Sequence, residues 1–148
     1  MKFGWINLWG AGIVLLMLIP NVLYAIKNKG ERNLCSNRLM NVLEQSGRYG
    51  CMIFMVVPLF VWEFGFGSVG EMLVYLIGNG LLLAAYGIVY AFYFGKKTRA
   101  RAMALTILPV LIFLLCGILL RHWLLVCFAI LFAVGHPYVT AKNLSASV

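Results

Sequence analysis

Five long apolar runs constrain this chain more strongly than any other feature of its sequence. Short polar segments separate them, and the runs cover residues 5–26, 49–66, 71–94, 102–120 and 123–140. A helix that crosses the hydrocarbon core of a bilayer needs about 20 consecutive, mostly apolar residues. Because polarity does not alternate from residue to residue along the runs, an outer-membrane β-barrel is disfavoured. The sequence therefore predicts an all-α, polytopic membrane protein in which residues 1–148 form one integral membrane domain of five bundled transmembrane helices.

Composition supports this class. Hydrophobic residues make up 64% of the chain and charged residues 11%, and the mean hydropathy is +0.96. Such a chain has too little polar surface to cover a water-soluble globule of its size. A secretory signal peptide is an alternative for the first run, but that run is long, begins with Trp5 and Trp9, and lacks a small-x-small cleavage site. Arg121 and His122 alone separate the last two runs, which predicts a tight helical hairpin.

The longest polar segment contains a helical pattern of its own. Between residues 32 and 46, Leu39, Val42 and Leu43 recur at roughly helical spacing among charged side chains. The pattern predicts an amphipathic helix lying on the bilayer surface, and a solvated loop is the alternative. Glu44 and Arg48 are four residues apart and are oriented favourably for an ion pair on such a helix.

The cations are distributed unevenly around the predicted spans. Ten of the 12 lysines and arginines follow the first, third or fifth span, namely Lys27, Lys29, Arg32, Arg38, Arg48, Lys96, Lys97, Arg99, Arg101 and Lys142. Lysine and arginine concentrate in cytoplasmic loops, so we expect a plasma (cytoplasmic) membrane protein with its amino terminus outside and its carboxyl terminus inside. Anionic lipids at these loops then explain the net charge of +8, and no nucleic-acid partner is predicted because no basic soluble domain is present.

The third run has two patterned faces. At 100° per residue, one face gathers polar and aromatic side chains within about 60°, namely Tyr75, Asn79, Tyr86, Tyr90 and Tyr93. The other face carries small residues, namely Gly80, Ala84, Gly87 and Ala91. Small residues permit close helix contact, and packing within the chain is favoured over assembly between copies. Tyr75, Tyr90 and Tyr93 lie near the predicted interfaces, where an aromatic belt explains them, so the prediction of a mid-membrane site depends on Asn79 and Tyr86.

Each predicted span contains a residue that disturbs a helix, and these residues are Pro20, Pro58, Gly78 with Gly80, Pro109 and Pro137. Backbone groups freed at such places line a cavity or find partners within the protein, and solutes often bind there. The candidate ligand-binding residues are Asn21, Tyr24, Asn79, Tyr86, Tyr90, Thr106 and His136. They predict a cytoplasm-facing intramembrane pocket for a small amphipathic or hydrophobic molecule. The alternative is that proline and glycine are simply frequent in membrane helices.

No catalytic or metal site is predicted. The four cysteines, Cys35, Cys51, Cys116 and Cys127, form no CxxC pair and lack ligand spacing. Cys116 and Cys127 lie at equal depth in the predicted hairpin, which permits a disulfide without establishing it, and small packing residues are the alternative. His122 is expected at a membrane interface. His136 has neither a nucleophile nor a carboxylate close to it in sequence.

The segment His136-Pro137-Tyr138 resembles part of the Arg-His-Pro-x-Tyr motif of isoprenylcysteine-type membrane methyltransferases, which also have a tight hairpin of late membrane helices. The resemblance implies a membrane-embedded methyltransferase-like enzyme as one alternative. Gly135 stands where that motif has arginine, so no site residue is transferred and no cofactor is assigned.

Three functions therefore remain, in order of preference. The first is binding or helping to transport a small molecule, as a homo-oligomer or beside a larger membrane partner. The second is a structural or regulatory membrane subunit without a ligand of its own, and the third is the enzyme. None of the four acidic residues is predicted at the bilayer centre, which disfavours a proton-coupled or cation-coupled transporter.

Overall fold

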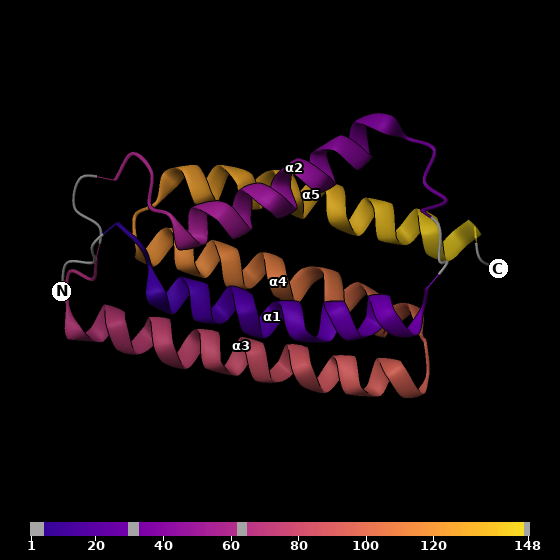
Figure 1. Cartoon of the computed structure of the whole chain (residues 1–148), viewed down its shortest axis with the longest axis horizontal. Coiled ribbons are helices and arrows are strands. Elements are labelled where there is room, and N and C mark those ends of the chain that lie inside the picture. Colours follow the sequence, from indigo (N-terminus) through magenta and orange to yellow (C-terminus); the bar gives the residue numbers. More distant parts are fainter. Residues whose placement is uncertain (1–4, 30–32, 62–64, 147–148) are drawn as a thin grey trace.

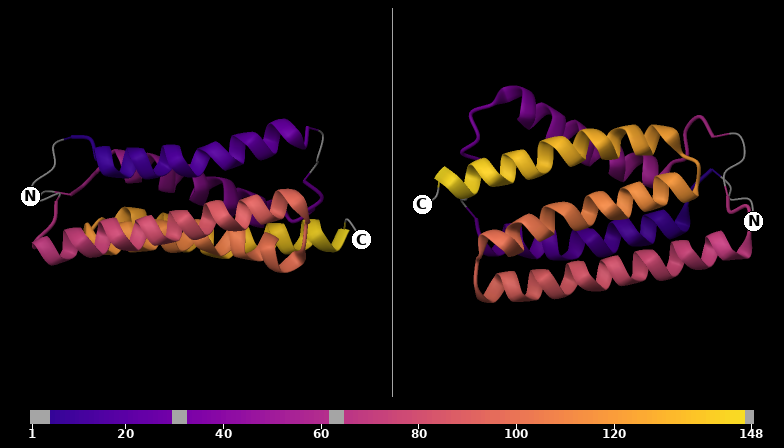
Figure 2. Two further views of the ribbon diagram at one scale, coloured as in Figure 1. Left: turned by 90° about the horizontal axis from the view of Figure 1, so that it is seen from below. Right: turned by 180° about the vertical axis from the view of Figure 1, so that it is seen from behind.

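The computed structural model describes residues 5–29, 33–61 and 65–146, and these contain five α-helices (Figure 1). The helices are α1 (Leu8–Lys27), α2 (Arg38–Val56), α3 (Val69–Gly95), α4 (Arg99–Leu119) and α5 (Trp123–Ala146). They run in alternating directions, so α1, α3 and α5 end where α2 and α4 begin (Figures 1 and 2). We call that end the basic end, because it carries Lys27, Lys96, Lys97, Arg99 and Lys142. The opposite end, where α4 turns into α5, is the hairpin end.

The helices begin where the sequence offers a capping side chain. Asn7, Asn37, Ser68 and Thr98 each precede a helix and accept a hydrogen bond from the backbone N–H three residues later. Such N-caps satisfy a donor that has no partner within the helix. The starts of the first four helices are thus explained by local sequence alone.

Four of the helices, α1, α3, α4 and α5, are long and apolar enough to cross a membrane. The remaining helix, α2, differs from what the sequence predicts. It joins most of the expected surface helix, residues 32–46, to the first part of the expected second span, residues 49–66. Residue 32 and residues 62–64 lie outside the described part of the chain.

Proline explains where α2 ends. The ring of Pro58 disfavours helical geometry in the residue before it. Val57 is accordingly extended, with φ −110° and ψ 107°, and the helix ends at Val56. Pro58 therefore lies beyond α2, which corrects the expectation that it interrupts the middle of a span.

Glycines bring α2 and α5 into backbone contact. A Cβ atom built on Gly47 would lie 2.6 Å from the backbone nitrogen of Phe132, and one on Gly135 would lie 2.5 Å from the backbone nitrogen of Glu44. Real Cβ atoms do not approach other atoms so closely, so these positions require glycine. Small residues of this kind let membrane helices pack with their backbones close together.

The small-residue face of α3 points away from the other helices. No described atom lies within 4 Å of a Cβ built on Gly80 or Gly87, and Ala84 and Ala91 are exposed. The expectation that this face packs within the chain is therefore wrong. Instead the tyrosine face of α3 is buried, with Tyr75 fully covered and Asn79 and Tyr86 2% and 3% exposed.

A three-residue turn, Leu120 to His122, joins α4 to α5 as the predicted hairpin requires. The N–H of His122 donates to the Gly117 carbonyl at 2.8 Å, and that of Arg121 donates to the Ile118 carbonyl at 3.1 Å. This pair of bonds is a Schellman motif, which places one residue in the left-handed region. Arg121 occupies that position, with φ +53°, and its Nη2 lies 2.7 Å from Oε1 of Glu71 at the start of α3.

His122 is buried within the protein, in the turn between the two candidate spans α4 and α5. It is 1% exposed, its Nε2 lies 3.2 Å from the Leu59 carbonyl, and its ring meets the Phe54 ring edge-on at 6.1 Å. Burial lowers the pKa of His122, although hydrogen bonds to the backbone of Leu59 and Phe54 act in the opposite direction. The residues that follow α2 therefore cover the imidazole.

We expect acid to destabilise the protein through His122. The unfolded chain binds a proton at this imidazole near pH 6.5, whereas the folded chain binds it only at lower pH. The contribution of His122 to stability is therefore fully present above the unfolded pKa of about 6.5. It decreases as the pH falls through that value toward the folded pKa. Melting temperatures in detergent micelles at pH 7.5, 6.5 and 5.5 measure this decrease. His122→Gln should reduce the dependence, and an unchanged dependence in that variant would assign it to other groups.

Candidate functional site

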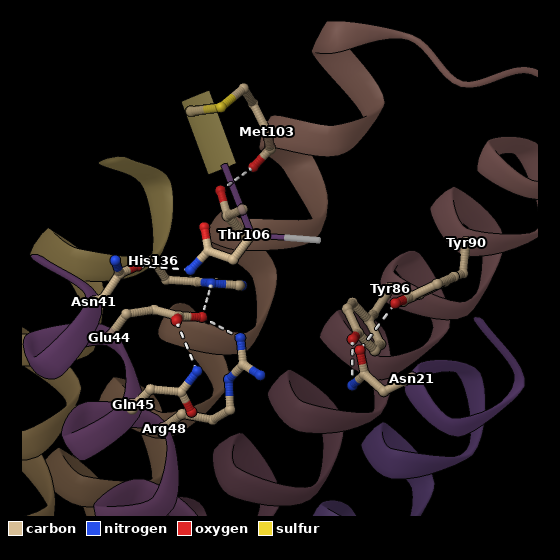
Figure 3. A network of polar contacts seen from close by, with 11 residues as sticks. Asn21, Asn41, Glu44, Gln45, Arg48, Tyr86, Tyr90, Met103, Thr106 and His136 are labelled. Carbon is tan, nitrogen blue, oxygen red and sulfur yellow. Dashed lines mark hydrogen bonds and ion pairs between the residues drawn. The ribbon is translucent and has the colours of Figure 1, made fainter. Parts of the chain in front are cut away.

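Two polar clusters lie between the helices (Figure 3). Both are nearer the basic end, because Asn21 is in the last third of α1 and Glu44 is in the first half of α2. The first, which we call the amide–phenol cluster, consists of Asn21, Tyr86 and Tyr90 and joins α1 to α3. The second, which we call the charged cluster, consists of Glu44, Arg48 and His136 and joins α2 to α5.

The side chain of Asn21 links the two tyrosines of the amide–phenol cluster by hydrogen bonds. Its Nδ2 donates to the Tyr86 hydroxyl at 2.9 Å and to the Met17 carbonyl at 2.8 Å. The Tyr90 hydroxyl donates to Asn21 Oδ1 at 2.9 Å. Tyr24 packs beside the cluster, with its ring centroid 6.2 Å from that of Tyr90. The structure thus brings together four of the seven candidate residues.

The charged cluster is centred on the Glu44 carboxylate, which is 3% exposed. Its Oε1 lies 3.0 Å from His136 Nδ1 and also accepts a hydrogen bond from Arg48 Nη2. Its Oε2 accepts a hydrogen bond from Gln45 Nε2 at 3.3 Å. The His136 ring stacks on Phe132, with centroids 4.5 Å apart. No carboxylate lies close to His136 in the sequence, and Glu44 of α2 supplies one in the fold.

The glycine contacts explain why a charged residue of α2 is buried. Gly135 precedes His136, and its Cα leaves room for the backbone of Glu44. Gly47 lies three residues after Glu44 on the same helical face and makes the matching contact with Phe132. Because the two backbones lie close together, the Glu44 side chain packs against α5 and contacts His136.

The polar segment that contains Glu44 predicts a surface position for this residue, whereas the structure buries it against α5. His136 is ten residues from the carboxyl end of α5, which is about 15 Å at 1.5 Å per residue. Because α5 is long and apolar enough to span a membrane, Glu44 contacts a candidate span through His136. A useful sequence signal was the spacing of Glu44 and Gly47, which puts a carboxylate and a close-contact glycine on one face.

Arg48 extends from the charged cluster toward the amide–phenol cluster (Figure 3). Its charge acts electrostatically on the hydroxyls of both Tyr86 and Tyr90. The guanidinium is partly accessible, since 35% of its side chain is exposed. In this view Arg48 lies between the two clusters (Figure 3).

Asn79 and Thr106 make their hydrogen bonds elsewhere. Asn79 Nδ2 donates to the Tyr75 carbonyl at 2.7 Å, and its Oδ1 accepts from the Cys116 thiol at 3.3 Å. The Thr106 hydroxyl donates to the Met103 carbonyl at 2.7 Å. In the described part of the chain, neither side chain hydrogen-bonds to either cluster.

Two surface hollows lie at the basic end, outside both clusters. One, of about 450 Å³, lies between the residues that precede α2 and the end of α5, and its lining includes Asn37, Tyr138 and Lys142. The other, of about 440 Å³, lies along α2 beside Asn41 and Gln45. None of the seven candidate residues lines either hollow.

The cysteines and potential metal ligands form no further site among the described residues. All four thiols are free, and Cys116 is buried against Asn79 whereas Cys127 is exposed. These two residues therefore do not pair. Within residues 5–29, 33–61 and 65–146, no group of three His, Cys, Asp or Glu side chains is placed to hold a metal ion.

Comparison with known proteins leaves the site to be interpreted from its chemistry. Neither a family model, nor a curated protein, nor a solved structure matches this chain. The described structure is that of a multipass, membrane-like helical protein with four helices capable of spanning a bilayer.

Proposed function

We propose that the protein binds, or helps to transport, a small amphipathic molecule between the amide–phenol and charged clusters, in the cytoplasmic half of the plasma membrane. The observation that carries this proposal is the position of Arg48, a cation among apolar helices that faces two tyrosines across the interior. Ionisable groups inside a membrane domain are costly, and they usually mark a ligand or ion path.

The outer face of α2 supports its insertion as a fifth span. Leu39, Val42, Tyr49 and Ile53 are each more than half exposed, and at 100° per residue they share one side of the helix. Glu44 and Arg48 lie on the opposite side. A helix with an apolar exterior and a polar interior face suits a lipid environment, although α2 falls short of the hydropathy of the other four.

The basic end supports the proposed orientation. With five spans, Lys27, Lys97, Arg99 and Lys142 share one side of the membrane, and such residues concentrate in the cytoplasm. The amino terminus is then outside and the carboxyl terminus inside. Anionic lipids of the inner leaflet are natural neighbours of this end.

A structural or regulatory subunit is the second candidate, and one observation favours it. Asn21, Asn79 and Thr106 each donate to a carbonyl three or four residues earlier in their own helix. Polar side chains satisfied in this way stabilise membrane helices without any ligand. Under this alternative, the two clusters set helix packing, and a protein partner supplies the function.

Ligand binding separates the two candidates. Purified protein in phosphatidylcholine nanodiscs is titrated with dodecanol, dodecanoate and dodecyl phosphate, and bound probe is counted by native mass spectrometry. The proposal expects at least one probe to bind saturably. In Asn21→Leu, we expect about fivefold weaker binding, because the hydrogen bonds that orient the Tyr86 and Tyr90 hydroxyls are lost and a total loss of about 1 kcal/mol is a factor of about five.

The matched control for this experiment is Tyr49→Phe, which removes an exposed hydroxyl from the lipid-facing side of α2. It should bind the probe as the unmodified protein does. If none of the three probes binds saturably, while Asn21→Leu lowers thermal stability, the structural alternative replaces the proposal.

A further inference from the structure

We infer that Arg48 recognises an acidic head group, so that the ligand is an amphipathic phosphate or carboxylate. This inference rests on the proposed function and adds the chemical class of the ligand to it. It depends on the unused hydrogen-bonding capacity of Arg48 and on the groups that surround it.

The guanidinium has more donors than its partners use. Arginine carries five N–H groups in a planar fork that suits carboxylate and phosphate oxygens. Among the described residues, Arg48 makes one hydrogen bond, from Nη2 to Oε1 of Glu44. The guanidinium is partly accessible, and N–H groups without an acceptor are costly where the surroundings are apolar, so an anionic oxygen at Nε or Nη1 would be stabilising.

The carboxylate of Glu44 does not saturate the site, because it is shared. His136 and Gln45 bind Glu44 as well as Arg48 does. They keep the carboxylate in place when Arg48 engages a second acid. Glu44 repels that acid and so weakens its binding without preventing it.

Hydroxyl groups lie on the other side of Arg48. The Tyr86 and Tyr90 hydroxyls are within range of its charge, and the Tyr86 hydroxyl accepts a hydrogen bond from Asn21. The Tyr86 hydroxyl is also hydrogen-bonded to Tyr90, so its proton is available to an acid only in place of that bond. An acid beside Arg48 would gain a second type of donor, which a neutral alcohol uses less well.

The three C12 probes test the inference, since they share a tail and differ in the head group. We expect dodecanoate and dodecyl phosphate to bind about tenfold more tightly than dodecanol. Arg48→Met should remove that preference, whereas Arg48→Lys, which keeps the charge and loses the planar fork, should keep part of it. Arg99→Met, at the start of α4, is the matched control and should retain the full preference.

Glu44→Gln gives an independent test that does not remove the arginine. It takes away the competing charge, so binding of both acids should become several times tighter while dodecanol binding stays the same. All affinities are measured at a temperature at which circular dichroism shows each variant to be folded. Equal binding of dodecanol and the acids, with no effect of Arg48→Met, would overturn the acid assignment and leave the proposed function standing. Binding of none of the probes would overturn both.

The acid can come from the membrane or from a free amphipath, and a second set of nanodiscs distinguishes these sources. Nanodiscs that contain phosphatidylglycerol offer a phosphate head group in the bilayer itself. If phosphatidylglycerol occupies Arg48, these nanodiscs should weaken dodecanoate binding in the unmodified protein, less in Arg48→Lys, and not in Arg48→Met. If dodecanoate binds equally in both lipids, the ligand is a free acid that the bilayer phosphate does not replace.

Discussion

Gly135→Ala is expected to destabilise the protein by about 1–3 kcal/mol, with larger side chains at this position costing more. The new Cβ would lie 2.5 Å from the backbone nitrogen of Glu44 and 2.8 Å from its Cα. A backbone cannot turn aside as a flexible side chain does, so α2 and α5 must separate. Their separation also breaks the contact between Glu44 and His136. SDS titration of the protein in mixed micelles, followed by circular dichroism, measures the loss.

Gly87→Ala is the matched control for this substitution. Gly87 is a glycine in the interior of a long helix, like Gly135, but no described atom lies within 4 Å of its built Cβ. We expect no loss of stability, and a gain of up to about 1 kcal/mol from the better helix propensity of alanine. Equal destabilisation by the two substitutions would show that backbone contact between α2 and α5 does not limit stability.

Glu44→Leu is expected to destabilise the protein by about 1–3 kcal/mol, because it leaves Arg48 without its counter-ion and the partial exposure of the guanidinium reduces the penalty for a buried unpaired charge. Arg48→Met should cost less, since Glu44 then keeps His136 and Gln45 as partners. The double variant Glu44→Leu/Arg48→Met should be more stable than Glu44→Leu alone, because apolar pairs often replace buried ion pairs without loss. The four proteins form a double-mutant cycle, measured by the same SDS titration.

The interaction energy from this cycle should be about 0.5–3 kcal/mol. Additive effects of the two substitutions would mean that Glu44 and Arg48 do not interact in the folded protein. A double variant that is as stable as the unmodified protein, but no longer distinguishes dodecanoate from dodecanol, would show that the charged cluster serves binding rather than folding. Such a result would separate the contribution of the charged cluster to stability from its contribution to binding.

Much of the helical structure follows from local sequence. Length and apolar character predict the four helices that can span a membrane, and capping residues such as Asn7 and Ser68 account for where they begin. The 100° periodicity also places Tyr75, Asn79 and Tyr86 on one face of α3, and that face is buried. The sequence leaves open what covers this face, and Asn21 of α1 covers part of it.

Only part of the candidate site could be predicted from the sequence. The polarity of Asn21, Tyr86 and Tyr90 identified them as candidates, and they meet because α1 lies beside α3. Glu44 and Arg48 were expected at the bilayer surface, since their own segment is polar. The burial of Glu44 depends on Gly135, which is 91 residues after it in the sequence.

The sequence by itself determined the helical membrane class, the four most apolar helices and the polar face of α3, because helix formation and membrane partition depend on residues within one or two turns of each other. Only the tertiary structure decided the bounds and packing of α2, the burial of Glu44 and the exposure of Gly80 and Gly87. These features depend on which helix lies opposite each face. A glycine permits close contact wherever it stands, but the contact forms only where a second backbone approaches, as α5 approaches α2 at Gly47 and Gly135.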